Sequence, residues 1–333
     1  MREPRFWSRE VDPKSREAAP LLRFLLTPLA AIYAGTTRRK ISKADPLKVD
    51  PVVICVGNLT AGGVGKSPVV AALRHQIRQT HGLRVATLSR GYKGRLKGPL
   101  RVDPANHSAA DVGDEPLMLA RRGEAWIGAD RAAAGEAMAA DGVEVIIMDD
   151  GHQNPGLFKD FTFVVVDSEA GFGNGFVIPK GPLRERIEDG LTRANAIILM
   201  GDATPPEELN RASVPIIKGT IVAAQRPPEG KYVAFAGIGR PEKFFDTLST
   251  LGVETCDAVP FPDHHTYSAA DLKYLRRLAD DHQATLITTD KDLTRLSADQ
   301  ASSILSLPIE VQFEPQEQLD KLIADVIKSA SNG

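Results

Sequence analysis

The sequence predicts an α/β protein: a P-loop NTPase-like, mainly parallel sheet flanked by helices, with a second, smaller α/β domain and an N-terminal membrane-associated helix. Three observations support this fold class. From residue 51 onward, short β-branched runs alternate with helical stretches, which is the pattern of parallel strands joined by helices. A glycine-rich loop at 60–67 follows the first such strand and precedes a helix. An apolar run at 18–35 is followed by a basic cluster at 38–40.

Residues 1–45 form the first predicted segment. The run 18–35 is shorter than the ~20 apolar residues of a spanning helix, and it contains Arg23 and Pro28. We interpret it as a helix lying in the membrane interface, and the alternative is a helix packed on the protein's own core. A secretory signal is disfavoured because the glycine-rich loop needs cytoplasmic ATP. Five basic side chains are available to anionic headgroups: Arg16, Arg23, Arg38, Arg39 and Lys40.

A P-loop domain is predicted over 46–225. A helix is expected from Lys66 to about Gly82, and an Ala-rich helix at 128–141. The stretches 91–116 and 169–193 lack a regular pattern, and loops of that length are usually functional or disordered. The expected buried strands are 51–57, 83–89, 143–150, 161–168 and 196–200.

A smaller α/β domain is predicted over 226–333, after the Pro-rich bend at Arg226. Its first strand ends in a Gly turn, and Pro241 begins the next helix. The expected strands are 231–239, 254–259 and 284–290, and the expected helices are 241–251, 268–282 and 316–330.

Composition excludes some classes of function. The 333 residues carry 41 basic and 43 acidic side chains, a net charge of −2, so there is no global electrostatic basis for binding nucleic acid. The two cysteines, Cys55 and Cys256, lie in apolar stretches and are interpreted as small buried hydrophobes in a reducing cytoplasm.

The glycine-rich loop carries the strongest chemical signal. Glycines let backbone N–H groups turn toward phosphate oxygens, and the following helix contributes its positive N-terminal end. Lys66 is suited to neutralise the β and γ phosphates, and the Ser67 hydroxyl to bind Mg²⁺. Thr60 stands where the usual motif has Gly. The predicted nucleotide-binding residues are Thr60, Ala61, Gly62, Gly63, Val64, Gly65, Lys66 and Ser67.

Four further acidic or imidazole clusters are candidates. Asp149 and Asp150 end a predicted strand, where they suit Mg²⁺ and water, and the alternative is a loop-capping pair. The segment 113–116, GDEP, offers either a helix N-cap or an acceptor base or metal ligand. The segment 261–267, FPDHHTY, reads as a capping turn or as a proton-handling site, and 288–292, TTDKD, as a site edge or plain loop.

Together these motifs resemble the tetraacyldisaccharide 4'-kinase family, the lipid A 4'-kinases of Gram-negative bacteria. That family's P-loop likewise tolerates Thr at its first position. The matching pieces follow the family's order: GNLTAGGVGKSP (57–68), LSRGYKG (88–94), GDEP (113–116), DDGHQ (149–153), IPKGPLRE (178–185), FPDHHTY (261–267) and TTDKD (288–292).

The resemblance implies a reaction and a location. It implies transfer of the ATP γ-phosphate to the 4'-hydroxyl of tetraacyldisaccharide 1-phosphate, which forms lipid IVA in lipid A biosynthesis. It also implies Mg²⁺ as cofactor, a lipid-linked disaccharide as substrate and attachment to the cytoplasmic face of the inner membrane. No obligate protein partner is inferred.

The resemblance also implies roles for individual residues. Asp114 looks like the base that faces the acceptor hydroxyl, His264 like its partner across the domain cleft, and Lys66 like a catalytic cation. Lys180 stays undecided, and His152 is assigned no role. The implied metal site comprises Ser67, Glu115, Asp149, Asp150 and Gln153, and the candidates for substrate contact are Arg90, Asn174 and Arg184.

Three other functions compete with this interpretation. A membrane-positioned partitioning-type switch ATPase carries a signature Lys in its loop, and no Lys occupies 58–65. A GTPase metallochaperone predicts an Asn-Lys-x-Asp motif and a Cys/His cluster, and both are missing from the sequence. A kinase for another small sugar or nucleoside leaves the apolar N-terminus unexplained.

Overall fold

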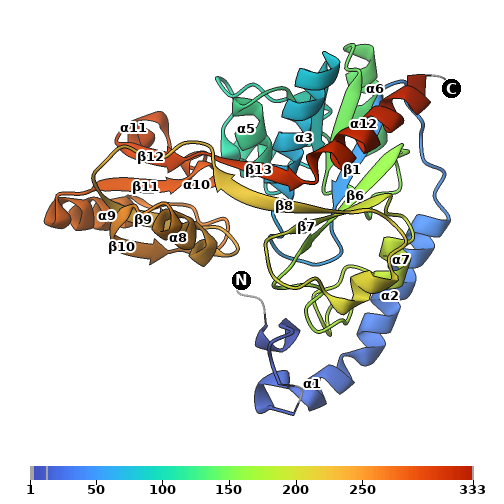
Figure 1. Cartoon of the computed structure of the whole chain (residues 1–333), viewed down its shortest axis with the longest axis horizontal. Helices are drawn as coiled ribbons and strands as arrows, with labels where there is room; N and C mark the ends of the chain where they lie inside the picture. The colour runs from blue at the N-terminus through green and yellow to red at the C-terminus, as the bar shows by residue number, and fades with distance from the viewer. Residues whose placement is uncertain (1–3, 13, 332–333) are drawn as a thin grey trace.

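Two sheets organise the chain in the computed structural model, which describes residues 4–12 and 14–331. The larger sheet has nine strands (Figure 1). Neighbouring strands run parallel, except that the strand at each edge runs antiparallel to the strand beside it. The strand order is β13 (Ile309–Glu314), β8 (Ile216–Ala223), β7 (Ala196–Met200), β6 (Phe161–Asp167), β1 (Val52–Gly57), β5 (Val145–Asp149), β2 (Val85–Ser89), β4 (Ala125–Ile127) and β3 (Leu100–Arg101). The prediction of a P-loop-like, mainly parallel sheet is confirmed.

The central strands are buried on both faces, as their unbroken apolar runs require. Every residue of β1 and β5 is buried, and the two strands pair in parallel from Val52 with Val145 onward. One face is covered by α3 (Lys66–His81), α5 (Asp114–Arg121) and α12 (Gln316–Ser331). The opposite face is covered by α6 (Arg131–Ala140), α7 (Ile187–Leu191) and part of α2 (Thr27–Ser42).

The smaller sheet is fully parallel, in the order β10 (Glu254–Pro260), β9 (Lys231–Ala236), β11 (Thr285–Thr289) and β12 (Ile304–Leu307). Helix α8 (Pro241–Thr250) covers one face through Phe244 and Leu248, and α9 (Ala269–His282) covers the other. The short helices α10 (Asp290–Leu293) and α11 (Ala298–Ala301) flank β12. We call the larger sheet with its helices the first unit and the smaller sheet with its helices the second unit.

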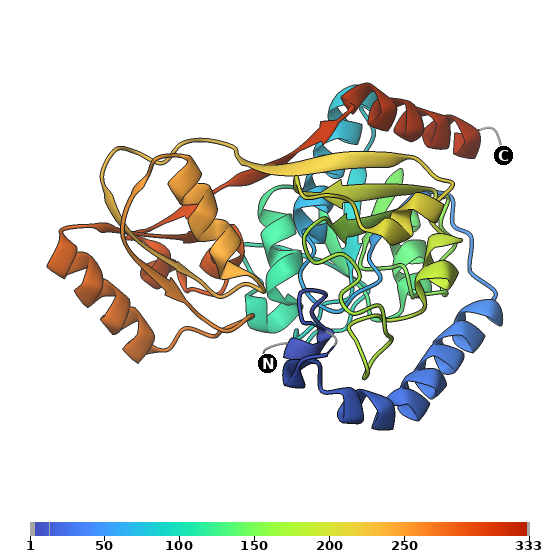
Figure 2. The same cartoon turned by 60° about the horizontal axis from the view of Figure 1, so that its bottom comes forward.

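The prediction that the last helix completes the second unit is wrong. The chain returns to the first unit through β13, which pairs antiparallel with β8 (Figure 2). On α12, Leu319 and Ile323 are buried in the core of the first unit. Sequence reasoning missed β13 because it is an edge strand in which buried and exposed residues alternate. The strands β3, β4, β8 and β12 were also missed, three of them because they contain only two to four residues.

The N-terminal segment forms two short turns and a bent helix pair. After the 3₁₀ turns at Arg5–Trp7 and Arg16–Ala18, α1 (Pro20–Leu25) meets α2 at an angle of 67°. Within the described residues no single helix is long and apolar enough to cross a membrane, although this bent pair passes the same criteria of length and composition when taken together. Leu21 and Phe24 are 72% and 74% exposed, so packing on the protein's own core does not account for α1.

The position of α12 leads to a test of stability. Leu319→Ala is expected to lower the free energy of unfolding by roughly 3 kcal/mol, because the Leu319 side chain is 0% exposed and its removal leaves a cavity in the core. Denaturant unfolding would measure this, with Lys321→Ala on the exposed side of α12 as the matched control. Equal stability of the two variants would contradict the packing of α12 on the first unit.

Candidate active site

The glycine-rich loop joins β1 to α3 and leaves a helix N-terminus facing outward from the sheet. Gly62 and Gly65 have φ angles of 107° and 86°, a backbone region in which side chains are strained. Gly65 is the residue that precedes α3, and it contributes no capping side chain. The N–H groups at this end of α3 therefore suit the phosphate cradle that the sequence predicts.

Lys66 is positioned by a residue that sequence reasoning missed. Asn58 is fully buried, and its Oδ1 accepts a hydrogen bond from Lys66 Nζ at 3.0 Å. The Asn58 amide donates in turn to the Thr60 carbonyl at 2.8 Å. Lys66 Nζ also lies 3.5 Å from Asp150 Oδ1. The lysine is thus held over the loop before any phosphate arrives. The only sequence signal for Asn58 is its place directly after the strand.

Thr60 replaces glycine at no structural cost. Its backbone forms an antiparallel bridge with Leu183, and the Ala61 N–H donates to the Pro182 carbonyl at 2.7 Å. Thr60 is not among the residues with positive φ. The 178–185 run therefore braces the entrance to the loop, and an extended residue suffices where the usual motif has Gly.

The two adjacent aspartates at the end of β5 differ in environment. Asp149 is 3% exposed, and its Oδ1 has no hydrogen-bond partner among the described residues. Burial, together with the charges of Glu115 and Asp150, raises the pKa of Asp149 to about 7. Asp150 Oδ1 accepts a hydrogen bond from Arg184 Nη1 at 2.7 Å. Burial works against its ionisation, but the charges of Lys66 and Arg184 prevail and lower the pKa of Asp150 to about 2.

The carboxylates fit a metal ion only in company with a nucleotide. No group of three or more His, Cys, Asp or Glu side chains within 4–12 and 14–331 has the arrangement of a metal site. Mg²⁺ in kinases takes one or two carboxylates and fills its remaining positions with phosphate oxygens and water. The buried, unpartnered oxygen of Asp149 and the Ser67 hydroxyl at the start of α3 suit that mixed coordination.

His152 and Gln153 make structural hydrogen bonds near the start of the glycine-rich loop. His152 Nε2 donates to the Gly190 carbonyl at 3.0 Å, and burial followed by the charge of Arg193 lowers the pKa of His152 to about 3. It is a neutral structural residue, as the sequence interpretation favoured. The Gln153 amide donates to the Asn58 carbonyl and to Glu185, both at 2.9 Å.

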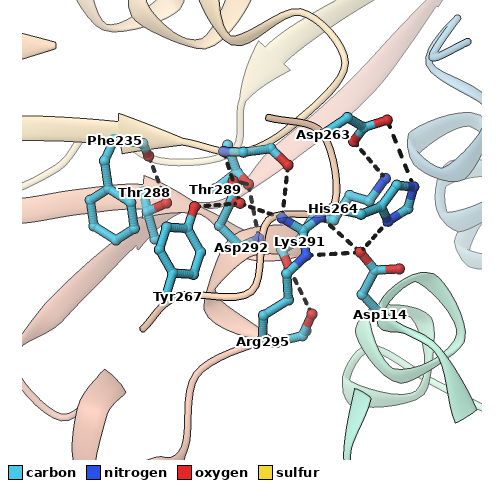
Figure 3. Close-up of polar contacts among 12 residues, drawn as sticks. Asp114, Phe235, Asp263, His264, Tyr267, Thr288, Thr289, Lys291, Asp292 and Arg295 are labelled. Atoms are coloured by element: carbon cyan, nitrogen blue, oxygen red, sulfur yellow. Dashed lines mark hydrogen bonds and ion pairs between the residues drawn. The ribbon is translucent and has the colours of Figure 1, made fainter. Parts of the chain in front are cut away.

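Asp114 and His264 come together although they are 150 positions apart (Figure 3). His264 Nδ1 donates to Asp114 Oδ2 at 2.8 Å. Arg295 donates to the same oxygen through Nε at 2.9 Å, and its Nη2 lies 2.7 Å away. Burial works against ionisation of this carboxyl, but the hydrogen bond from His264 and the charges of Lys291 and Arg295 hold the pKa of Asp114 well below its usual value.

Arg295, which carried no sequence motif, is itself locked by the second unit. It donates to the Gly237 carbonyl at 2.7 Å and to Asp292 at 2.6 Å, and Tyr267 donates to Asp292 at 2.8 Å. In the TTDKD segment, Lys291 donates to Glu115 at 3.0 Å, so this segment lies beside the residue that follows Asp114. In the FPDHHTY segment, His265 joins the cap of α9 as the capping interpretation expects, and His264 faces Asp114, while proton handling by this segment stays a prediction.

A second set of ion pairs joins the units beside the P-loop. Arg240 and Lys243, at the start of α8, both pair with Asp167 at the end of β6. Burial works against ionisation, but hydrogen bonds from the Ala170 N–H, Lys243 and Arg240 lower the pKa of Asp167. A Cβ atom at Gly239 would stand 3.7 Å from the Gly63 nitrogen, so the turn before α8 lies directly against the P-loop.

The three candidates for substrate contact have different surroundings. Arg184 is engaged with Asp150, and Arg90 is exposed just beyond β2. The Asn174 amide donates to the carbonyls of Phe6 and Lys180, at 2.7 and 3.0 Å. Asn174 therefore holds its loop together, and its amide is not free for a substrate.

Comparison with known proteins identifies the family. A family model described as tetraacyldisaccharide-1-P 4'-kinase matches residues 22–328. The tetraacyldisaccharide 4'-kinase of Hyphomonas neptunium is 55% identical over 330 residues, which cover 99% of both chains. This chain belongs to the tetraacyldisaccharide-1-P 4'-kinase family.

Further members of the family agree. The tetraacyldisaccharide 4'-kinase of Rhodospirillum centenum is 48% identical, with 98% of this chain and 97% of that protein covered. The crystal structure of LpxK from Aquifex aeolicus in complex with ATP is similar at a TM-score of 0.73 and 28% identity, and the match covers 92% of this chain and 99% of that chain. The chain is therefore an ATP-dependent kinase that acts on tetraacyldisaccharide 1-phosphate in lipid A biosynthesis, and the alternative functions are set aside.

The raised pKa of Asp149 predicts a gain of stability on mutation. At pH values between the ordinary pKa of an aspartate and about 7, Asp149 keeps its proton in the folded state and loses it in the unfolded state. The free energy of unfolding therefore falls as pH rises through this range. At pH 8, with a chelator present to remove divalent cations, Asp149→Asn is expected to raise the free energy of unfolding by on the order of 3 kcal/mol. At pH 4 the same substitution should change it little.

The matched control is Asp167→Asn, the other buried aspartate at a strand end. The lowered pKa of Asp167 gives the opposite sign, so this variant is expected to be less stable at pH 8, and the difference should shrink as pH falls. Thermal unfolding across pH would measure both. An Asp149→Asn variant that is destabilised at pH 8 would refute the assignment.

Proposed function

We propose that the kinase site is assembled at the junction of the two units, with the nucleotide on the P-loop and the acceptor hydroxyl at Asp114. The observation that carries this proposal is the hydrogen bond between His264 of the second unit and Asp114 of the first. Asp114 is followed directly by Glu115, whose charge acts on Asp149 beside the loop. The proton-handling group and the phosphate-binding group thus share one charged surface.

The nucleotide is held by 60–67, with Lys66 on the terminal phosphates. Support comes from the Asn58 and Asp150 contacts of Lys66 and from the ATP in the similar Aquifex aeolicus structure. A bound Mg²⁺ neutralises charge on the phosphates. The residues that would hold it and its waters are Ser67, Glu115, Asp149 and Asp150, with Gln153 as their support.

Asp114 acts as the base that takes the proton from the acceptor hydroxyl. Its depressed pKa makes it a weak base, but a loose phosphoryl-transfer transition state keeps that proton on the hydroxyl until late, when the oxygen has begun to bond to phosphorus and the proton is acidic. His264 and Arg295 keep the carboxylate ionised and oriented. The contribution of the protein is therefore mainly position and charge.

The two units, 46–225 with 309–331 and 226–308, act as the two sides of this site. Among the residues that the structure describes, the side chains that hydrogen-bond to Asp114 both belong to the second unit, so the base is organised only when the units meet. Contact of the units also covers the P-loop at Gly239. Such closure excludes water and suppresses futile ATP hydrolysis.

The acceptor is reached at the cytoplasmic face of the inner membrane, where α1 and α2 attach the enzyme. The exposed apolar residues of α1 and the basic residues at the end of α2 suit an interfacial helix pair. Arg90 and Arg184 contact the substrate, whereas Asn174 acts through the loop that it holds.

The first experiment is transfer of labelled γ-phosphate from ATP to tetraacyldisaccharide 1-phosphate in detergent micelles. Lys66→Ala is expected to reduce kcat/KM roughly 10²-fold or more, because it removes a preorganised cation from the phosphates. Lys273→Ala, an exposed residue of α9, is the matched control and should behave as the unaltered protein. Near-normal transfer by Lys66→Ala would refute the phosphate assignment.

A double-mutant cycle tests the pair formed by Asp114 and His264. Asp114→Asn and His264→Gln are each expected to lower kcat by about 10²–10⁴-fold with little change in KM for ATP. The double variant should lose little more than the worse single variant, because the two residues act as a unit. Losses that multiply would show that the two side chains work independently.

A further inference from the structure

The N-terminal segment builds a cavity against the loop that precedes the 178–185 run. Trp7 Nε1 donates to the Pro179 carbonyl at 3.2 Å, and the Asn174 backbone N–H donates to the Trp7 carbonyl at 2.8 Å. Between segment and loop lies a cavity of about 250 Å³. Its polar and charged lining comprises Ser8, Arg9, Arg23, Asn174 and Glu208.

The cavity carries an excess of positive charge. Arg9 and Arg23 face a single lining carboxylate, Glu208, and over the described part of the chain no carboxylate lies within ion-pair distance of either guanidinium. Arg23 lies over the Phe176 ring at 4.9 Å, and Lys180 lies over the same ring at 4.0 Å. Lys180 likewise has no ion-pair partner among the residues that the structure describes. Arg9 and Arg23 therefore line the cavity with a single carboxylate, and an anion bound there would balance the remaining positive charge.

The same helix that contributes Arg23 exposes an apolar surface. Its large hydrophobic side chains are among the most exposed in the molecule: Leu21, Leu22, Phe24 and Leu25 are 72%, 44%, 74% and 62% exposed. An anion that binds beside such a surface is expected to carry hydrocarbon chains. Charge complementarity and apolar surface together describe a phospholipid, with its phosphate in the cavity and its acyl chains along α1.

We propose that this cavity is a binding site for the phosphate of an anionic phospholipid, separate from the site of the acceptor. Ser8 and Arg9 come from the segment before α1 and Arg23 from α1 itself, so the cavity joins two parts of the N-terminal segment. The bound lipid would hold the N-terminal segment at the membrane and set the depth of α1. The inference rests on the membrane attachment proposed above.

The test uses a phospholipid that is monomeric in solution, so that diffuse attraction to a charged surface plays no part. Dihexanoyl phosphatidylglycerol, below its micelle-forming concentration, is titrated into the full chain by calorimetry. Arg9→Gln with Arg23→Gln is the test variant, and Arg38→Gln with Arg39→Gln, on the neighbouring α2, removes the same charge outside the cavity. Arg9→Lys with Arg23→Lys keeps the charge.

Saturable binding is expected for the unaltered protein and the α2 variant, with affinity at least about tenfold weaker in the cavity Gln variant and largely kept in the Lys variant. Absence of saturable binding, equal loss in both Gln variants, or equal binding of inorganic phosphate alone would overturn the proposal.

Kinase assays in neutral detergent separate the two claims. The cavity Gln variant should keep its kcat and its KM for tetraacyldisaccharide 1-phosphate, since the lipid site is distinct from the acceptor site. If the cavity Gln variant instead showed a raised KM for the acceptor and unchanged binding of phosphatidylglycerol, the cavity would bind the phosphate of the acceptor. That result would overturn the proposal. The kinase function itself would still stand in that case.

Discussion

The buried carboxylate of Asp114 is the constraint on which the arrangement of the two units depends. A charge removed from water is costly unless it is paired and hydrogen-bonded, and removal of one partner of such a pair is strongly destabilising. The side chains that pair with Asp114, those of His264 and Arg295, come from the second unit, whereas Asp114 begins a helix of the first. The second unit must therefore sit against the first in one place for this charge to be satisfied.

From Asp114 a continuous run of charges leads to the nucleotide loop. Lys291 pairs with Glu115, the neighbour of Asp114, and the charge of Glu115 bears on Asp149. At the far end Asp150 is balanced by Lys66 and Arg184. Asp149 Oδ1 has no hydrogen-bond partner among the described residues, and burial raises the pKa of this carboxyl despite the nearby charges of Lys66 and Arg131. The carboxylate is thus poorly solvated, which is a cost that a bound cation would relieve.

Sequence reasoning succeeded where the signal is local. The five central strands, the loop before α3 and the paired aspartates each show within about ten residues, because burial on both faces and phosphate binding impose their own short patterns. The meeting of Asp114 with His264 has no such pattern, and only the resemblance to a family predicted it. Asn58 and Arg295 are single polar residues whose importance comes from what folds next to them.

The wrong placement of α12 has the same cause. Edge strands such as β13 bury only alternate residues, so their pattern is weak. Antiparallel pairing with β8 is a long-range property that the 85 intervening residues of chain do not encode locally. Thr60 shows the reverse case. It violates the motif as written, yet its extended backbone, paired with Leu183, supplies all that the loop entrance requires.

The second junction between the units is built on Asp167, a buried carboxylate like that of Asp114. Its pairs with Arg240 and Lys243 satisfy a charge removed from water, whereas the pairs of the same two cations with the exposed Glu169 are screened and contribute little net free energy. The turn at Gly239 lies directly against the backbone of Gly63 in the P-loop, with the Asp263 carboxylate nearby. Buried carboxylates at two places thus define the direction in which the units meet, because each is paired across the junction. A kinase that must place a nucleotide against an acceptor hydroxyl needs that definition, because phosphoryl transfer depends mainly on position and charge.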